Sequence, residues 1–318
     1  MNDMRAALYD RYGPPEVLYE GRVPVPARKP GEVLVRVHAA SVNGGEVHGR
    51  AGKVRLVTGR LFPQRTGIDF VGEVAEVDPA VTGLRAGDRV WGLLGRTFGS
   101  AAEYVSVRPR QIAYAPGNVT STEAVSLLAG GTTSLTALRD KAGLRAGERL
   151  LVRGASGGVG SVAVQLGKAL GAHVTGLASA KNLDFVRELG ADEALDHRAT
   201  PLADLNRYDV ILDTVGTEHR ALQWRLTAGG RLVSIAFDID RPVRSIGCIL
   251  GSVVQGRRRV RFFSGNPKHD LLAELTAYVE RGDLRPVVDT IRPLAEIAAA
   301  HRALEAGGVR GKHVIDLV

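Results

Sequence analysis

The residues best suited to chemistry in this sequence form a glycine-rich turn, Gly154-Ala155-Ser156-Gly157-Gly158-Val159-Gly160. Small residues let the backbone approach a pyrophosphate, whose charge meets the amides and the positive dipole at a helix N-terminus. The same glycines would also suit a helix that only packs tightly on a sheet. Because an apolar run precedes the turn and a helical pattern follows it, we expect a dinucleotide site that includes Gly154, Ser156, Gly157, Gly158, Val159 and Gly160.

The next strand of such a site would end in Leu177-Ala178-Ser179-Ala180-Lys181, which contains no acidic residue. Sites that prefer NAD carry an acid about 20 residues after the glycines, where it binds the ribose hydroxyls and repels a 2′-phosphate. Ser179 can donate a hydrogen bond to that phosphate, and Lys181 supplies a positive charge. This pattern predicts NADPH, the alternative being that Lys181 is only an exposed lysine at a helix start. His197 and Arg198 are further candidates for contact with the adenine or the 2′-phosphate.

Composition limits the class of protein. The 318 residues include 44% hydrophobic and 24% charged ones, which is typical of a soluble globular protein with about two domains. The one cysteine, Cys248, excludes an internal disulfide and a thiolate-only zinc cluster, and it indicates a reducing compartment. No run approaches the roughly 20 apolar residues that cross a bilayer, and the N-terminal residues do not resemble a secretion signal, so we expect a cytoplasmic protein and no membrane partner.

A positive net charge, here +8, is a feature that nucleic-acid-binding proteins share. Most of the basic residues are scattered along the chain. The densest run, 257–261, leads directly into Phe262 and Phe263 and is interpreted as a solvated strand edge. We therefore do not expect nucleic acid as a partner.

Two kinds of pattern divide the chain. Up to about residue 120, short alternating segments predict a β-rich unit with strands at 31–40, 70–77, 89–93 and 102–107. Helical spacing begins near Ser121, and from residue 149 strands alternate with helices, which predicts a doubly wound Rossmann-type parallel sheet. Its strands are expected at 149–153, 173–177, 193–195, 209–213, 231–236 and 259–263, and its helices at 158–170, 182–189 and 218–226. The tail is expected to form a helix at 271–280, a strand at 287–291, a helix at 294–305 and a strand at 313–318.

Further motifs occur in a fixed order along nearly the whole chain. They are Gly31-Glu32-Val33-Leu34-Val35 before Ser41-Val42-Asn43, Gly67-Ile68-Asp69-Phe70-Val71-Gly72-Glu73-Val74, Ala86-Gly87-Asp88-Arg89-Val90, the glycine turn, Asp209-Val210-Ile211-Leu212-Asp213, Gly229-Gly230-Arg231-Leu232-Val233 and Arg310-Gly311-Lys312. In this order they resemble the medium-chain dehydrogenase/reductase superfamily, and within it the zinc-free quinone oxidoreductase branch. The resemblance implies an α/β protein with a GroES-like β-rich catalytic domain, residues 1–120 completed by the tail 265–318, a Rossmann NADPH-binding domain, residues 121–264, and a cleft where they meet.

Zinc-dependent members of this superfamily carry an early Cys ligand and Gly-His-Glu where this chain has Gly67-Ile68-Asp69, and their structural zinc needs four closely spaced Cys. The nearest set to a metal site consists of His38, Glu46, His48 and Asp69, which we interpret as ordinary polar residues, so no metal is expected. Without a Lewis acid, alcohol oxidation is disfavoured. Reduction of a quinone or an α,β-unsaturated carbonyl is favoured, because the negative charge delocalises onto an oxygen that a few hydrogen-bond donors can hold.

The resemblance also implies individual site residues. Asn43 matches the family's active-site Asn, whose amide donates to a substrate carbonyl or near the nicotinamide, and capping of the following turn is its alternative. His48 stands where quinone reductases often have Tyr; it is either a donor of a hydrogen bond or proton to the developing enolate or a solvated loop residue. Arg50 falls on a family position at the rim of the substrate pocket. For the cofactor the implied residues are Thr133, with a helix cap as its alternative, Val215, Gly216, Phe263, Ser264, and the basic pair Arg310 and Lys312.

The leading hypothesis is an NADPH-dependent oxidoreductase that transfers hydride, without a metal, to a quinone or another α,β-unsaturated carbonyl. An enoyl-thioester reductase of a polyketide or fatty-acid type pathway is the first alternative, with the run 257–261 as a landing patch for a carrier. A non-catalytic NADPH-binding protein is the second. Because relatives commonly pair through the edge strand of the Rossmann sheet, and 259–263 is near that edge, we also expect a homodimer.

Overall fold

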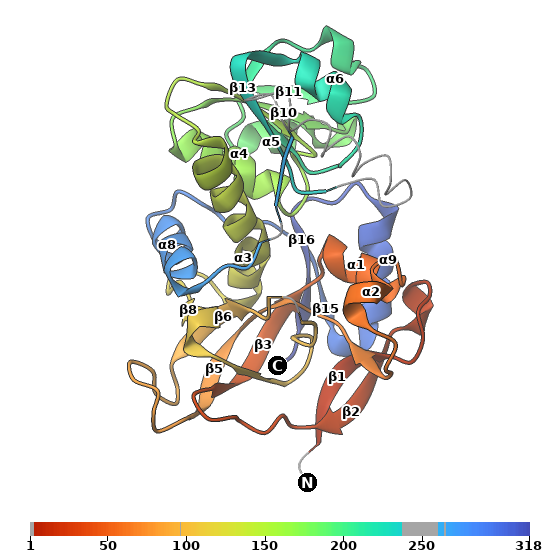
Figure 1. The fold of residues 1–318 in the computed structure, drawn as a ribbon, viewed down its shortest axis with the longest axis vertical. Helices are drawn as coiled ribbons and strands as arrows, with labels where there is room; N and C mark the ends of the chain where they lie inside the picture. Colours follow the sequence, from red (N-terminus) through yellow and green to blue (C-terminus); the bar gives the residue numbers. More distant parts are fainter. Residues whose placement is uncertain (1–2, 96, 237–259, 264) are drawn as a thin grey trace. The chain divides into compact units, whose positions relative to one another are not determined.

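The computed structural model describes residues 3–95, 97–236, 260–263 and 265–318. The chain forms two compact units, Met1–Ala129 with Asn266–Val318, and Gly130–Gly265 (Figure 1). The domain boundaries expected from the sequence, at residues 120 and 264, stay a prediction. Within the residues that the structure describes, no helix has the length and apolar character needed to cross a membrane.

The first unit is built from two sheets that share a core. A three-stranded sheet has the order β2-β1-β4, and a seven-stranded sheet has the order β15-β16-β3-β5-β6-β8, with β7 also paired to β3. The strands are β1 (Asp3–Tyr9), β2 (Tyr19–Pro24), β3 (Val33–Ser41), β4 (Gln64–Arg65), β5 (Asp69–Val77), β6 (Arg89–Leu93), β7 (Tyr104–Val107), β8 (Ile112–Tyr114), β15 (Val288–Pro293) and β16 (Lys312–Asp316). Its helices are η1 (Pro15–Val17), α1 (Gly44–Arg50), α2 (Arg55–Thr58), η2 (Pro109–Gln111), α8 (His269–Glu280), η7 (Leu294–Glu296) and α9 (Ile297–Ala306), and α3 (Ser121–Leu135) continues into the second unit.

One strand pairing in this unit determines where the chemistry-bearing residues meet. β3 is apolar over most of its length, with Val33, Val35 and Val37 in the core. The last strand, β16, pairs antiparallel with β3 so that Val314 lies opposite Ser41, and Val42 N donates to His313 O at 3.0 Å. This register brings the start of β16 beside the residues that follow β3, although the two segments are far apart in the sequence.

The second unit is a parallel sheet with helices. Its strand order, β11-β10-β9-β12-β13-β14, is 3-2-1-4-5-6 in chain order, and every strand pair is parallel. This is the Rossmann arrangement, with its reversal between β9 and β12. The strands are β9 (Arg149–Arg153), β10 (His173–Ala178), β11 (Glu193–Asp196), β12 (Tyr208–Asp213), β13 (Leu226–Ser234) and β14 (Val260–Phe262), and the helices are η3 (Thr136–Ala142, π-type), α4 (Gly160–Ala169), η4 (Ala180–Asn182), α5 (Leu183–Glu188), η5 (Leu202–Asp204) and α6 (His219–Trp224).

The α/β fold class is confirmed, with a GroES-like sheet unit and a Rossmann-type unit. Some details of the sequence-based prediction were wrong, among them the short strands β4 and β8, which it did not include. The strand expected at 231–236 runs from Leu226 to Ser234, because the register shifts after Tyr208 and the extra residues around Gly229 and Gly230 form an irregularity within the strand rather than a turn. The sequence reading also missed β1 and β2; β1 is almost continuously buried and therefore shows no clear alternation.

Candidate functional site

The glycine-rich turn joins the carboxyl end of β9 to the start of α4, next to the point where the strand order reverses. Gly154 has φ +80°, and a Cβ there would lie 2.3 Å from Thr214 Oγ1 in the loop after β12. A Cβ at Gly160 would lie 2.0 Å from Gly154 O, so both positions need glycine. Open parallel sheets bind ligands at this reversal, outside the carboxyl ends of the strands.

The loop after β10 carries the residues expected to choose between cofactors. Ser179 Oγ is buried and has no hydrogen-bond partner among the described residues, while Lys181 is exposed. Asn182, which sequence reasoning missed, is fully buried and donates from Nδ2 to Ser156 Oγ at 3.1 Å, so it ties this loop to the glycine turn. A buried hydroxyl without a partner among the described residues can donate to a polar group that binds there. The loop therefore offers a donor to the ribose end of a dinucleotide.

The neighbouring loops complete this edge of the sheet. His197 Nδ1 lies 2.9 Å from Ala178 O, and Arg198 is exposed. After β12, the buried Asp213 accepts the backbone N–H groups of Val215 at 3.1 Å and Gly216 at 3.0 Å. This loop leaves the apolar side chain of Val215 46% exposed, as a surface on which a flat ring could pack.

Three other residues were expected to bind the cofactor, and two of them lie in the described part of the chain. Thr133 is half-buried and lies well inside α3, so it is not a helix cap. Phe263 follows β14 directly and is half-buried. Ser264 lies outside the described residues. Roles for these three in binding remain predictions.

In the first unit, Asn43 lies between β3 and α1 and is 8% exposed. Its Nδ2 is 2.9 Å from Glu46 Oε1, 3.1 Å from Ser41 O and 3.2 Å from Asp69 Oδ1. Its Oδ1 accepts a hydrogen bond from Lys312 Nζ, which fixes the orientation of the amide because an ammonium group only donates. The protein thus supplies acceptors for both amide hydrogens, and the side chain makes no cap bond to α1.

Three ionisable side chains are buried together in this cluster. Lys312 is 6% exposed, Glu46 2% and Asp69 0%. Burial, followed by the charge of Asp69, raises the pKa of Glu46 to about 8. Burial also raises the pKa of Asp69 and lowers that of Lys312, although the two carboxyl groups favour the lysine's charge. At neutral pH a pKa of about 8 keeps Glu46 mostly protonated, and the carboxyl group of Asp69 favours the charged form of Lys312.

This donor set does not fit a zinc ion. Of His38, Glu46, His48 and Asp69, the carboxyl groups of Glu46 and Asp69 accept hydrogen bonds from Asn43 Nδ2. The cationic group near these two carboxyl groups is that of Lys312. Where the side chains are described, no group of three or more His, Cys, Asp or Glu is arranged to hold a metal ion. From the sequence, Glu46 and Asp69 are interpreted as ordinary polar residues, whereas the structure buries both carboxyl groups in the cluster around Asn43. The sequence contained one signal of this burial: Asp69 is the first residue of the apolar strand β5.

The other site residues predicted in this unit have different surroundings. Arg50 is 1% exposed; it donates to Gly13 O at 2.5 Å and forms an ion pair with Glu305 of α9, which lies beside α1 (Figure 1). These contacts place Arg50 inside the unit and not at a pocket rim. His48 is half-buried on α1. Arg310 and Lys312 do not form a pair of similar residues, because Arg310 is exposed and Lys312 is buried.

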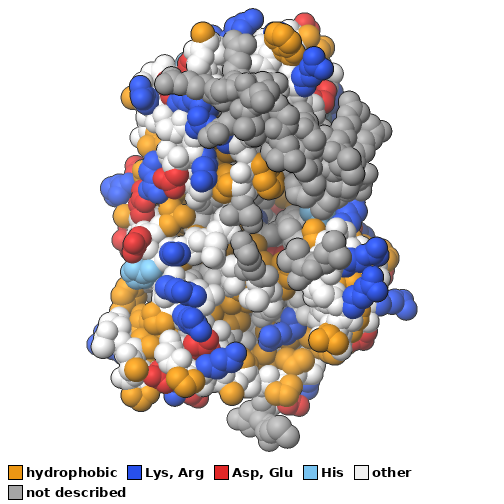
Figure 2. All heavy atoms as spheres, viewed as in Figure 1, with side chains coloured by type: hydrophobic (Ala, Val, Ile, Leu, Met, Phe, Trp, Pro, Cys, Tyr) orange, Lys and Arg blue, Asp and Glu red, His pale blue; other side chains and the backbone are white. Residues whose placement is uncertain are grey.

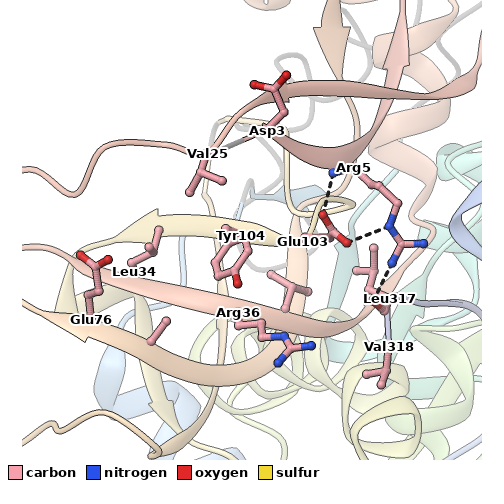
Figure 3. A pocket seen from close by; sticks show the side chains of 12 residues that line it. Asp3, Arg5, Val25, Leu34, Arg36, Glu76, Glu103, Tyr104, Leu317 and Val318 are labelled. Carbon is pink, nitrogen blue, oxygen red and sulfur yellow. Dashed lines mark hydrogen bonds and ion pairs between the residues drawn. The ribbon is translucent and has the colours of Figure 1, made fainter. Parts of the chain in front are cut away.

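A separate pocket of about 530 Å³ lies in the first unit (Figure 3). Its wall includes Arg5, whose Nε is 2.7 Å from Glu103 Oε1 and whose Nη2 donates to Leu317 O at 3.4 Å. None of the residues selected from the sequence lines it. The ion pair leaves Asp3, Arg36 and Glu76 as further charged side chains of the wall, and no observation connects the pocket with the reaction.

Basic side chains are spread over the face drawn in Figure 2, with acidic side chains among them. Of the run 257–261, residues 257–259 lie outside the described part of the chain. The expectation that nucleic acid is not a partner stays a prediction.

Two family models match the chain: the alcohol dehydrogenase GroES-like domain over residues 29–117 and the zinc-binding dehydrogenase domain over residues 189–315. The chain is 33% identical to mitochondrial NAD(P)H oxidoreductase RTN4IP1 of Mus musculus, over 99% of this chain and 89% of that protein. It is also 33% identical to the chloroplastic NADPH-dependent alkenal/one oxidoreductase of Arabidopsis thaliana, over 98% and 79%. The structure of a quinone oxidoreductase from Coxiella burnetii superposes with a TM-score of 0.91 at 30% identity, covering 100% of both chains. With two units, a glycine turn at the strand reversal and these relatives, the chain belongs to the medium-chain dehydrogenase/reductase superfamily, in its quinone oxidoreductase branch.

Proposed function

We propose that this protein uses NADPH to reduce quinones or other α,β-unsaturated carbonyls, without a metal ion. The observation that carries the proposal is the loop after β10, where the buried Ser179 Oγ lacks a partner among the described residues and Lys181 follows in place of an acid. A 2′-phosphate would accept from the hydroxyl and pair with the ammonium group.

The cofactor would be held by residues of the second unit. The turn from Gly154 to Gly160 would receive the pyrophosphate at the positive end of α4, and Val215 with Gly216 would border the nicotinamide end. When bound, NADPH supplies a hydride. The residues of the second unit that we assign to the cofactor are Thr133, Gly154, Ser156, Gly157, Gly158, Val159, Gly160, Ser179, Lys181, Val215, Gly216, Phe263 and Ser264. Arg310, in the tail of the first unit, stays a prediction from the sequence.

The substrate class follows from the acceptor chemistry that the first unit can support. A conjugated carbonyl needs a donor and positive charge near its oxygen, and Lys312, which Asn43 Oδ1 holds, can supply both. The names of two relatives, an alkenal/one oxidoreductase and a quinone oxidoreductase, support the same class. No observation in the described residues favours the enoyl-thioester alternative. The cytoplasmic location and the homodimer are likewise proposals from the sequence.

The test is oxidation of reduced nicotinamide, followed by absorbance, with an ortho-quinone, a simple enone and a crotonyl thioester. Each acceptor is paired with NADPH and with NADH, in the presence and absence of a chelator. The proposal expects turnover with NADPH on the quinone or the enone that the chelator does not change. NADPH binding without turnover on any acceptor would favour the non-catalytic alternative, and turnover on the thioester alone would favour the enoyl reductase.

A charge reversal at Lys181 tests the choice of cofactor. In Lys181→Glu the carboxylate repels a 2′-phosphate, so we expect the KM for NADPH to rise about 10-fold or more, which corresponds to about 1.4 kcal/mol. The KM for NADH should change little, because NADH has no phosphate at that position. Steady-state kinetics with both cofactors measure this.

Lys141→Glu is the matched control, because Lys141 is exposed in the same unit and the substitution changes the net charge equally. Its KM for NADPH should stay within about 2-fold of the wild-type value, since exposed charges are screened over roughly 10 Å. Equal increases in the two variants would show that only the overall charge matters, and an unchanged KM in Lys181→Glu would remove Lys181 from the site.

A further inference from the structure

Reduction of a conjugated carbonyl creates a charge that the protein must hold. When a hydride adds to the carbon–carbon double bond of an enone, a C–H bond forms, the π bond breaks and the electron pair moves to the carbonyl oxygen. A proton from water then completes the two-electron reduction. Between these steps the oxygen is negative, and a fixed donor beside it lowers the barrier. The question is which group in the first unit is that donor.

The amide of Asn43 is a poor candidate for this task. Its two N–H hydrogens face Ser41 O, Glu46 Oε1 and Asp69 Oδ1, all within 3.2 Å. A substrate oxygen would have to compete with these protein acceptors. The structure therefore gives Asn43 a positioning task, in which its Oδ1 holds Lys312.

The ammonium group of Lys312 has one donor hydrogen more than the described residues accept. Nζ donates to Asn43 Oδ1 and lies 3.4 Å from Val42 O, and no third acceptor occurs among the described residues. An ammonium group carries three N–H bonds. Because Lys312 is 6% exposed, water has little access to it, and one donor of a buried cation is left to an incoming group.

Asp69 and the backbone fix Lys312, and open space lies at the start of α1. Asp69 favours the charged form of the lysine, against burial, which lowers its pKa. Pairing of β16 with β3 fixes the backbone from which the side chain extends. At the start of α1, a Cβ added to Gly44 or to Gly45 would meet nothing within 4 Å, so the segment next to Asn43 faces open space.

We propose that Lys312 is the group that binds the substrate oxygen and stabilises its negative charge, with Asn43 as the residue that positions it. This inference rests on the proposed reductase activity. The sequence predicted that Lys312 binds the cofactor, and the inference makes it a substrate-binding residue. The sequence predicted that Asn43 donates to the substrate, and the inference makes it the residue that positions Lys312.

The test compares Lys312→Met and Lys312→Ala with the wild-type protein, using NADPH and the best acceptor. Loss of an oxyanion donor is expected to lower kcat about 100-fold or more, while the Kd for NADPH, measured by its fluorescence, stays within about 2-fold. In Lys312→Ala, added ethylammonium should raise kcat about 5-fold or more, whereas tetramethylammonium, which has no N–H donor, should not. A purely structural lysine would not make rescue depend on an N–H bond.

Loss of the cation leaves Asp69 buried with less compensation, so a folding defect must be separated from a defect in chemistry. The double variant Lys312→Met/Asp69→Asn removes both charges and keeps the cluster neutral. We expect it to melt near the wild-type temperature and still to show the low kcat. Lys141→Met, which removes an exposed lysine of the other unit, is the control and should keep its kcat.

Each outcome decides between hypotheses. If the double variant folds and its kcat is within about 3-fold of wild type, Lys312 does not hold the substrate charge. If the single variants lose NADPH affinity at unchanged kcat, Lys312 belongs to the cofactor site and our inference is wrong. A wild-type protein that reduces no acceptor overturns the proposed function itself, and with it the inference.

Discussion

Replacement of Gly160 by alanine is expected to abolish NADPH binding and to destabilise the second unit by about 3 kcal/mol or more. The added Cβ would lie 2.0 Å from Gly154 O and 2.8 Å from Ala155 Cα. Both are backbone atoms, so no side-chain rotation can relieve the contact, and the turn must move away from the first turn of α4. The pyrophosphate site depends on the same turn, because its amides and the helix N-terminus act together.

Gly157→Ala is the matched control, because it adds the same methyl group to the same turn. Its Cβ would lie 3.6 Å from Gly154 O, which is ordinary van der Waals contact. Thermal unfolding followed by circular dichroism should show a melting temperature lower by about 10 °C for Gly160→Ala and by less than about 2 °C for Gly157→Ala. Equal melting temperatures for the two variants would show that close backbone contact does not determine the need for glycine here.

The dinucleotide half of the protein could be predicted well, because its signals are local in sequence. The strand expected at 149–153 is β9 with the same bounds, and the expected helix at 158–170 contains α4. The glycines mark the turn between them. The parallel direction of the strands follows from the regular alternation of strands and helices.

The chemistry of the first unit could not be predicted in the same way. Asn43 and Lys312 are 269 residues apart in sequence, and they meet only because β16 pairs with β3 in one particular register. The resemblance selected both residues, but it gave no information on which atoms of Asn43 the protein already uses. Arg50 shows the same difficulty, since its partner Glu305 is 255 residues away. Long-range pairing decides whether a polar side chain faces a substrate or another part of the chain.

Burial of a carboxyl group was the other feature that the sequence concealed. Glu46 follows two glycines in a segment that would suit an exposed loop, yet it lies on the inner face of α1 and contacts Thr66 at 3.2 Å. Most buried polar atoms of the cluster bond to one another, and one N–H of Lys312 is left over among the described residues. Burial of Glu46 also predicts how the free energy of unfolding depends on pH.

Between about pH 5 and pH 8, Glu46→Gln is expected to become progressively more stable relative to the wild-type protein. Burial raises the pKa of Glu46 from 4.5 to about 8 in the folded state. Over this range the folded protein keeps a proton that the unfolded chain has released, so the stability of the wild type falls as pH rises, by up to about 1.4 kcal/mol per pH unit for this one group. Glutamine does not titrate and keeps an oxygen that can accept from Asn43.

The measurement is urea unfolding of both proteins at intervals across this range, with the difference in free energy of unfolding as the readout. Asp69 and Lys312 face Glu46 and titrate in both proteins, so to first order the difference isolates the glutamate. Glu123→Gln is the control: hydrogen bonds from Thr120 lower the pKa of Glu123, so its contribution is lost only in acid, as the pH falls through that lowered pKa. Its difference from the wild type should therefore be flat above about pH 5. A flat difference for Glu46→Gln as well would mean that Glu46 is ionised in the folded protein. Lys312 would then face two negative carboxylates in a cluster with net negative charge. Such a cluster is unsuited to holding a substrate anion.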